Sequence, residues 1–207
     1  MAAAVAVLAL ATALAIPTVR TRALRAAGSM LVAEDAISSA NVIVITLDAD
    51  AAGVLEAADL THRGVAPRVA VFADPPDAVD AEFLRRGVPY EDGAARAIRQ
   101  LQALGVQNVE RIPRSVAGSE DESRVLPGWC DQKGIDSVVV VTRMDHTLRM
   151  RRLLRRAMGG RRVRLAIRGS RYSHFNPENW WQTRAGLRTG IIEMQKLLLD
   201  VARHPLS

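Results

Sequence analysis

The sequence predicts an α/β fold in which five strands form a mainly parallel sheet and a long helix closes the chain. After residue 40, short apolar segments rich in β-branched residues alternate with segments whose apolar residues recur at helical spacing. This alternation implies right-handed crossovers and a doubly wound sheet. Because the 207 residues contain no linker-like stretch after this point, we expect one such domain.

Five segments have the composition of buried strands, and the third has the weakest pattern. They are Asn41–Leu47, Arg68–Ala73, Asn108–Ile112, Ser137–Val141 and Arg162–Ile167. Doubly wound sheets bind their ligands beyond the carboxyl ends of the strands. We therefore expect functional residues in the loops that follow the first four strands, at Asp48–Gly53, Ala73–Asp77, Pro113–Ser119 and Thr142–His146.

Helices are predicted between the strands and after the last one. The predicted helices are Ala51–Arg63, Asp77–Arg86, Ala94–Gly105, Ser119–Lys133, Thr147–Met158 and Thr183–Arg203. Phe83 and Leu84 are expected on the apolar side of the second. Trp180 and Trp181, just before the last helix, indicate that this helix packs on the edge of the sheet.

The first residues of the chain are unlike the rest. Ala2–Pro17 has no charged side chain, and Arg20, Arg22 and Arg25 follow it. We interpret residues 1–27 as a membrane anchor or signal-like segment and residues 28–207 as the α/β domain. The segment is short for the roughly 20 residues of a membrane span, so a cleaved signal and a soluble helix remain alternatives. The expected location is the inner (plasma) membrane, with the side of the domain left open, although the positive-inside rule favours the cytoplasm.

Composition excludes several kinds of site. The formal net charge is +6, and 26 of the 28 basic residues are arginine. The single cysteine, Cys130, excludes an internal disulfide and a zinc site built from cysteines. The chain has no glycine-rich phosphate loop, no dinucleotide fingerprint and no nucleophile elbow. Its four histidines lack metal-ligand spacing, so we predict no metal site and can name no cofactor.

The strongest functional signal follows the fourth strand. That strand runs into Thr142 and His146, and the next helix carries five arginines between positions 149 and 156. A histidine at this edge of a sheet could donate to an anion or transfer a proton near neutral pH. Arg149 lies three positions later, on nearly the same side of the helix, where it could bind a phosphate. The alternative is that His146 caps the helix and the arginines coat a surface.

Two further loops carry candidate ligand-binding residues. Asp48 and Asp50 follow the first strand, where carboxylates could hold Mg²⁺ or act as a base, or could simply form a solvated turn. Ser119 and Glu122 could hydrogen-bond a ligand, but their spacing is that of a capping box, which is the simpler interpretation. Glu193 and Lys196 have the spacing of an ordinary ion pair on a helix surface.

A basic stretch suggests an anionic partner. Arg143–Arg171 contains eleven arginines and one acid, Asp145. Such a face could meet nucleic acid or the headgroups of anionic lipids. Aromatic residues for base stacking are missing from the stretch. The composition therefore favours a membrane surface over nucleic acid.

Three motifs in this order resemble a bacterial family of unknown function that includes YdcF, SanA and ElyC. The motifs are "VVVVTRMDHTLRMRRLLR", the preceding "GSEDES" and the following "NWWQTRAGLRTGIIEMQKL". Thr142, His146 and Arg149 match the family's Thr-Ser-x-x-His-x-x-Arg motif, with Arg143 in place of the serine. Ser119 and Glu122 match its acidic helix start, and the tail is matched by Trp180, Trp181, Arg184, Glu193 and Lys196.

The resemblance implies a Rossmann-like three-layer sandwich and a role in the cell envelope, in peptidoglycan or lipid-carrier metabolism. One branch of the family has been associated with S-adenosylmethionine, without an established reaction. The family's glycine-rich turns after the first two strands are replaced here by "LDADAAG" and "ADPPD". Glycine allows a ligand to approach the backbone closely. Its loss therefore indicates a different ligand or a lost pocket.

These observations lead to one hypothesis and two alternatives. We expect a membrane-anchored envelope protein whose domain binds a phosphorylated small molecule, either nucleotide-like or a polyprenyl-phosphate-like lipid. Arg149 would bind the anion, His146 would assist or transfer a proton, and Thr142 and Ser119 would orient the ligand. The alternatives are a scaffold or regulator that has lost the family pocket and, third, a nucleic-acid binder. Whether the protein turns over a substrate is left open.

Overall fold

The computed structural model, which describes residues 12 and 15–205, contains one parallel five-stranded sheet. The strands are β1 (Val42–Ile45), β2 (Val69–Ala73), β3 (Val109–Ser115), β4 (Ser137–Arg143) and β5 (Arg164–Ser170), in the order β3-β2-β1-β4-β5. All four neighbouring pairs are parallel. The predicted doubly wound, Rossmann-like sandwich is confirmed, and every predicted strand is present.

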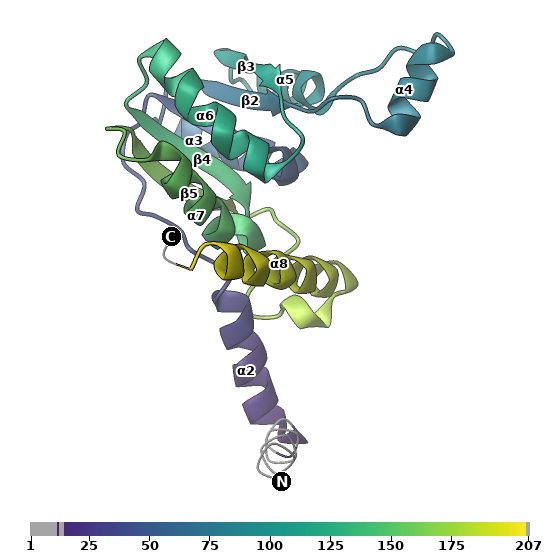
Figure 1. Ribbon diagram of the computed structural model, residues 1–207, viewed down its shortest axis with the longest axis vertical. Helices are drawn as coiled ribbons and strands as arrows, with labels where there is room; N and C mark the ends of the chain where they lie inside the picture. The colour runs from purple at the N-terminus through teal and green to yellow at the C-terminus, as the bar shows by residue number, and fades with distance from the viewer. Residues whose placement is uncertain (1–11, 13–14, 206–207) are drawn as a thin grey trace.

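Helices cover both faces of this sheet, and further helices lie outside these layers. The helices are α2 (Pro17–Ser29), α3 (Asp50–His62), α4 (Ala78–Arg85), α5 (Gly93–Ala103), α6 (Ser119–Lys133), α7 (Thr147–Met158) and α8 (Arg184–Arg203), with short 3₁₀ helices at Leu47–Ala49 (η1), Met144–His146 (η2) and Trp180–Gln182 (η3). α6 and α7 lie on one face and α3 and α5 on the other, while α8 crosses the end of the domain from which α2 projects (Figure 1).

The two cores follow from the alternation of side chains along each strand. In β1, Val42 and Val44 join the cluster that contains α6 and α7, whereas Ile43 and Ile45 join the cluster beneath α3 and α5. All four are essentially inaccessible to solvent. A central parallel strand is covered on both faces, which is why this segment reads as a continuous apolar run rather than an alternating one.

The order of the strands creates a switch point between β1 and β4. The chain builds outward from β1 to β3, and α6 then carries it back so that β4 pairs with the other side of β1. Ile45 is in register with Val141, so the residues that follow the two strands leave the sheet next to each other. Open α/β sheets bind their ligands at such a point, beyond the carboxyl ends of the strands.

The tryptophan pair connects the two terminal helices. Trp180 is buried, stacks on Phe175, and donates from Nε1 to the carbonyl oxygen of Leu24 in α2 at 2.8 Å. A Cβ at Gly28 of α2 would lie 2.6 Å from the Trp180 ring, so α2 approaches too closely for any larger residue. The expectation that the tryptophans pack α8 on the edge of the sheet is wrong, because the residues clustered with them come from α2 and the segment after it, from α8, and from Met144 and Phe175, and none belongs to a strand.

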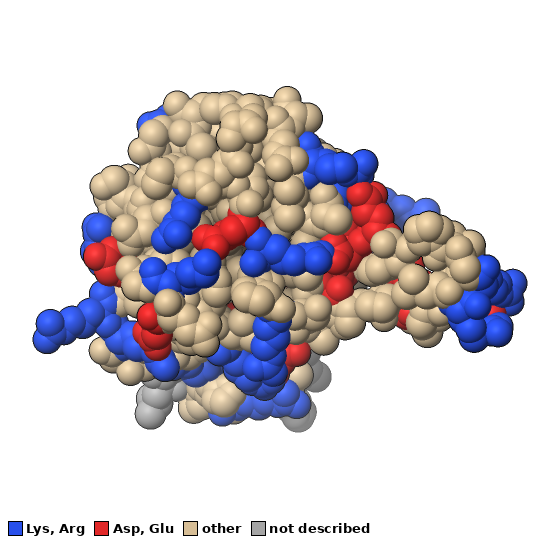
Figure 2. Space-filling view, turned by 90° about the horizontal axis from the view of Figure 1, so that it is seen from above, with Lys and Arg blue, Asp and Glu red and all other residues tan. Residues whose placement is uncertain are grey.

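The helix α4 stands apart from the body of the molecule (Figure 1). Its start is fixed by a capping box between Asp77 and Asp80. Phe83 and Leu84 are 51% and 45% exposed, so the apolar packing side predicted for this helix does not form. Figure 2 shows this segment projecting from the domain, with basic side chains at its far end.

Most of the predicted anchor lies outside the described residues. Within the part of the chain that the structure describes, no helix has both the length and the apolar character needed to cross a membrane. The predicted boundary at residue 27 falls inside α2, which continues to Ser29 and buries Gly28 against the domain. The membrane anchor itself stays a prediction.

Replacing Gly28 by alanine should loosen the contact between α2 and the domain. The new Cβ would meet the Trp180 ring and the carbonyl oxygen of Pro177 at 2.7 Å, and overpacking of this kind costs about 1–3 kcal/mol. The matched control is Gly128→Ala, which lies within α6 where a new Cβ meets nothing within 4 Å. That control should gain up to about 1 kcal/mol. Urea unfolding of both variants checks this, and an equal change in both would contradict it.

Candidate functional site

Asp48 lies at the switch point, held by two hydroxyl groups, one from the residue after β1 and one from β4. Its Oδ1 accepts from Thr46 Oγ1 at 2.6 Å and from Thr142 Oγ1 at 3.1 Å. Its Oδ2 lies 3.8 Å from His146 Nε2 and 3.8 Å from Arg143 Nε. Burial by itself would raise the pKa of Asp48. His146 and these hydroxyl and guanidinium groups outweigh it, so the pKa lies below its ordinary value.

His146 is fully buried behind Asp48, and its other nitrogen meets a carboxylate from α8. Nδ1 lies 2.7 Å from Glu193 Oε1. Arg149 donates from Nε to the same oxygen at 2.6 Å and from Nη2 to the other oxygen at 3.3 Å. The side chain of His146 makes no capping hydrogen bond, so the capping alternative does not hold. Asp48, His146 and Glu193 thus form a carboxylate–imidazole–carboxylate row.

Glu193 stays ionised because of its two partners. Burial by itself would raise the pKa of this carboxyl group, but the hydrogen bonds and charges of His146 and Arg149 lower it to about 2. The carboxylate is 1% exposed. The sequence interpretation of Glu193 and Lys196 as a surface ion pair is therefore wrong.

Glu122 is the second buried carboxyl group near this row. Its Oε1 accepts from the backbone nitrogen of Leu47 at 2.6 Å, and its Oε2 is buried without a hydrogen-bond partner. Burial raises the pKa of Glu122 to about 7, an effect that the Leu47 amide only partly opposes. The predicted capping box is wrong, because the N-cap is Gly118 and the glutamate turns inward to η1 instead of back to the helix start.

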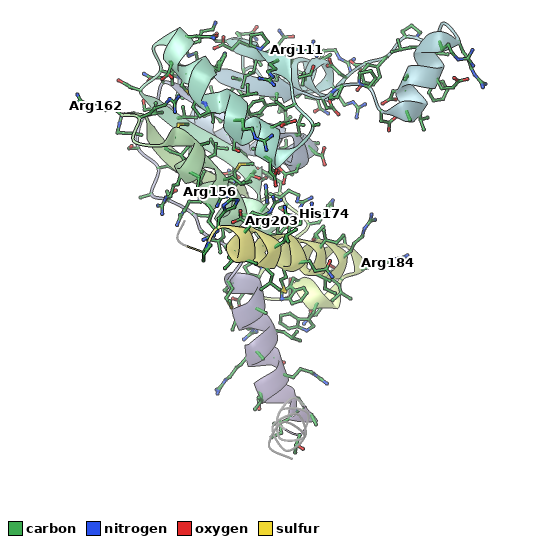
Figure 3. The ribbon with its side chains drawn as sticks, viewed as in Figure 1. Arg111, Arg156, Arg162, His174, Arg184 and Arg203 are labelled. Carbon is green, nitrogen blue, oxygen red and sulfur yellow. The ribbon has the colours of Figure 1, made fainter. Side chains whose placement is uncertain are left out.

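A cleft of about 800 Å³ opens beside Asp48. Its walls come from the start of α6, from α7 and from the last turns of α8. Its charged lining residues are Asp48, Glu120, Asp121, Arg124, Arg149, Arg156, Lys196, Asp200 and Arg203, with His204 beside them, and its other lining residues include Gly118, Ser119, Leu153, Ala157 and Leu199. Figure 3 shows Arg156 of α7 and Arg203 of α8 in this region. Arg156 is paired with Asp200, whereas Lys196 and Arg203 form no ion pair with any residue that the structure describes.

The predicted site residues divide into three groups. Thr142, His146 and Arg149 gather with Asp48 as predicted; Thr142 and His146 are fully buried, whereas Asp48 and Arg149 are partly exposed and line the cleft. Ser119 lines the cleft as the first residue of α6. Asp50, which has a left-handed φ of 46°, lies instead in a second hollow with Asp74 and Tyr90.

Glu193 is the site residue that the sequence interpretation missed. The sequence does contain a pattern that indicates its burial, because Gly186, Gly190 and Glu193 recur at helical spacing and so share one face of α8. In the structure these three are the buried residues of the helix. Two glycines on the same face as a glutamate indicate that this face, with its carboxylate, approaches other parts of the chain closely.

Most arginines of the basic stretch are neutralised by acids from distant parts of the chain. Eight of the eleven form ion pairs: Arg143, Arg149, Arg151, Arg152, Arg156, Arg161, Arg168 and Arg171. Their partners include Asp35 and Asp200, which local sequence does not reveal. Figure 2 likewise shows acidic side chains set among basic ones on the face that it presents. The stretch is therefore not one free cationic face.

Comparisons with known proteins add no relative. The chain matches no protein-family model, no curated protein and no solved structure. The likeness to the YdcF, SanA and ElyC family thus stays a prediction from motifs. Among the residues that the structure describes, no three histidine, cysteine or acidic side chains are placed to hold a metal ion.

Glu122 should make stability depend on pH near neutrality. Its folded pKa is raised to about 7, so the stabilising effect of its proton is present below about pH 4.5 and is lost as the pH rises towards 7. Glu122→Gln keeps an acceptor for Leu47 and cannot ionise. Relative to the wild type, the variant should gain up to about 3 kcal/mol between pH 4.5 and 8. Urea unfolding at both pH values measures this, and a difference that does not change with pH would contradict it.

Glu193 should make the stability of the fold fall, rather than rise, as the pH is lowered through the acid range. Its folded pKa is lowered to about 2, so its contribution is present above the unfolded value near 4.5 and is lost as the pH falls towards 2. Glu193→Gln should therefore be less stable than the wild type at pH 7, with a gap that narrows below pH 4.5. The control Glu178→Gln breaks an exposed pair with Arg25 and should change stability by less than about 1 kcal/mol.

Proposed function

We propose that the domain binds a phosphorylated ligand in the cleft beside Asp48. The observation that carries this proposal is that Lys196 and Arg203, on one wall of the cleft, have no acidic partner among the described residues. The first turn of α6 lines the same cleft but carries Glu120 and Asp121. Because these carboxylates compete with any other anion for the start of the helix, the phosphate is placed on the wall formed by α8. Two exposed cations on that wall suit a phosphate group.

The carboxylate of Asp48 constrains how such a ligand would lie. Because Asp48 is held ionised, a phosphate beside it would be repelled. The phosphate therefore belongs at the rim, with Lys196 and Arg203, and the remainder of the ligand extends towards Asp48 and along the apolar wall of Leu153 and Leu199. This arrangement would accept a phosphorylated small molecule or a lipid phosphate.

The floor of the cleft would supply a proton carrier. His146 Nε2 and Glu122 Oε2 are both buried and have no hydrogen-bond partner in the described part of the chain, and buried polar atoms in that state are rare. Asp48 is partly exposed and lines the cleft. Asp48 would therefore contact the ligand, while His146, oriented by Glu193, would hold or move a proton behind it. A role in the cell envelope, as the family resemblance implies, completes the proposal.

A second candidate is a scaffold without catalysis. The guanidinium of Arg149, the residue expected to bind the anion, is engaged by Glu193. The turns after β1 and β2 also lack the family's glycines. Both observations favour a domain that keeps the architecture and has lost the original pocket.

Ligand-induced stabilisation separates the two candidates. Thermal unfolding of the full chain would be followed with inorganic phosphate, a sugar nucleotide, S-adenosylmethionine or a polyprenyl phosphate. A ligand present at about 100 times its dissociation constant adds about 2.7 kcal/mol. We expect a shift with a phosphorylated member of this panel.

The double variant Lys196→Gln with Arg203→Gln should remove that shift without unfolding the domain, because both side chains are exposed. The control variant, Arg162→Gln with Arg164→Gln, removes two exposed cations at the start of β5 and should keep the shift. No shift with any of the compounds would favour the scaffold. A shift that survives in the Lys196/Arg203 variant would place the ligand elsewhere.

A further inference from the structure

The last helix, α8, leaves most of its surface uncovered. It has twenty residues, of which Gly186, Gly190 and Glu193 are buried. Exposed large apolar side chains follow one another along it: Leu187, Ile191, Ile192, Leu198, Leu199 and Val201, with Leu198 70% exposed. Apolar side chains scattered singly on a surface need no explanation, but a row of them indicates an interaction surface.

Part of this row forms one face that points away from the cleft. Leu187, Ile191 and Leu198 recur at helical spacing and therefore share a side of α8. None of the three lines the cleft, whereas Lys196, Leu199 and Arg203 do. The helix thus has an inner face on the domain, a second face on the cleft and an outer apolar face.

The charged side chains of α8 are also unevenly distributed over its three faces. Neither of its two acids lies on the outer face: Glu193, on the inner face, binds His146 and Arg149, and Asp200, on the cleft face, binds Arg152 and Arg156. Its exposed charged side chains are all basic.

Beside the outer apolar face lie Arg184 and Arg188, which form no ion pair within the described part of the chain. Figure 3 shows Arg184 at the end of α8 opposite to Arg203. An apolar face flanked by cations and free of exposed acids is complementary to an anionic, partly apolar surface.

The neighbouring helix α2 likewise combines exposed apolar side chains with basic residues and no acid. It packs against η3 and α8 through Leu24 and Trp180. Near its start, Ile16 is 50% and Val19 is 39% exposed. The helix contains three arginines and no acid.

We propose that the outer face of α8, together with α2, docks on an anionic lipid bilayer, with α8 lying in the plane of the interface. A helix with an apolar face and a basic polar face binds in this way, with its apolar side chains among the acyl chains and its cations at the headgroups. A second copy of the chain fits less well. A symmetric dimer brings the same surface against itself, and α8 exposes no acid to pair with its arginines. This proposal is independent of the ligand in the cleft.

Sedimentation of the full chain with vesicles tests the charge requirement. The vesicles would contain phosphatidylcholine alone or with phosphatidylglycerol. Each basic residue near an anionic leaflet contributes about fivefold to binding. Arg184→Glu with Arg188→Glu should therefore weaken binding to the anionic vesicles at least about tenfold.

The matched control is Arg162→Glu with Arg164→Glu, which changes the net charge equally at the amino end of β5. It should bind as the wild type does. An equal loss in both variants would mean that only net charge matters and would overturn the proposal, as would equal binding of the wild type to both kinds of vesicle.

Contact is tested separately, so that binding through another segment is not mistaken for binding through α8. A polarity-sensitive dye would be attached to Leu198→Cys and, as a reference, to Val79→Cys on α4; the native Cys130 is buried. With anionic vesicles, the dye at position 198 should shift to the blue and be quenched by nitroxide-labelled lipid, and the dye at position 79 should not.

A protein that sediments with vesicles while the dye at position 198 is unaffected would overturn the proposal. Two results together would assign this face to a second copy of the chain instead. The dye at position 198 would shift to the blue with rising protein concentration in the absence of lipid, and sedimentation velocity would show a dimer that Leu198→Ser abolishes.

Discussion

The buried carboxylate of Glu193 is the constraint on which the arrangement of the site depends. It belongs to α8, near the end of the chain, and it neutralises Arg149 and contacts His146 at the start of α7. A buried charge that loses its partner costs about 3–5 kcal/mol. The position of α8 over the end of the sheet is therefore set by an electrostatic requirement as much as by packing, because only three residues of the helix are buried.

This placement of α8 completes both surfaces proposed to bind ligands. With its inner face fixed by Glu193, the helix brings Lys196 and Arg203 to the cleft. It also turns Leu187, Ile191 and Leu198 outward, towards the proposed lipid surface. The glycines at 186 and 190 permit the close approach to Trp180 that connects α8 with α2. One helix thus links the cleft, the row of Asp48, His146 and Glu193, and the amino-terminal helix.

Most of the fold could be predicted from local sequence. All five strands were found, and α7 was predicted with its observed boundaries. The cluster of Asp48, Thr142, His146 and Arg149 also followed from the sequence, because strands in a doubly wound sheet place their following residues at one edge. Ser119 and Glu122 were misassigned because a capping box and a helix start with an inward-facing glutamate share the same spacing.

The sequence by itself determined the alternation of strands and helices, the position of the switch point and the identity of the residues beside it, since each depends on patterns within a few residues. The tertiary structure decided which charges remain available. It showed that Glu193 is buried, that most arginines of the basic stretch are paired, and that Lys196 and Arg203 have no acidic partner within residues 15–205. Ion pairs depend on distances between residues far apart in the chain, and only the folded molecule fixes those distances.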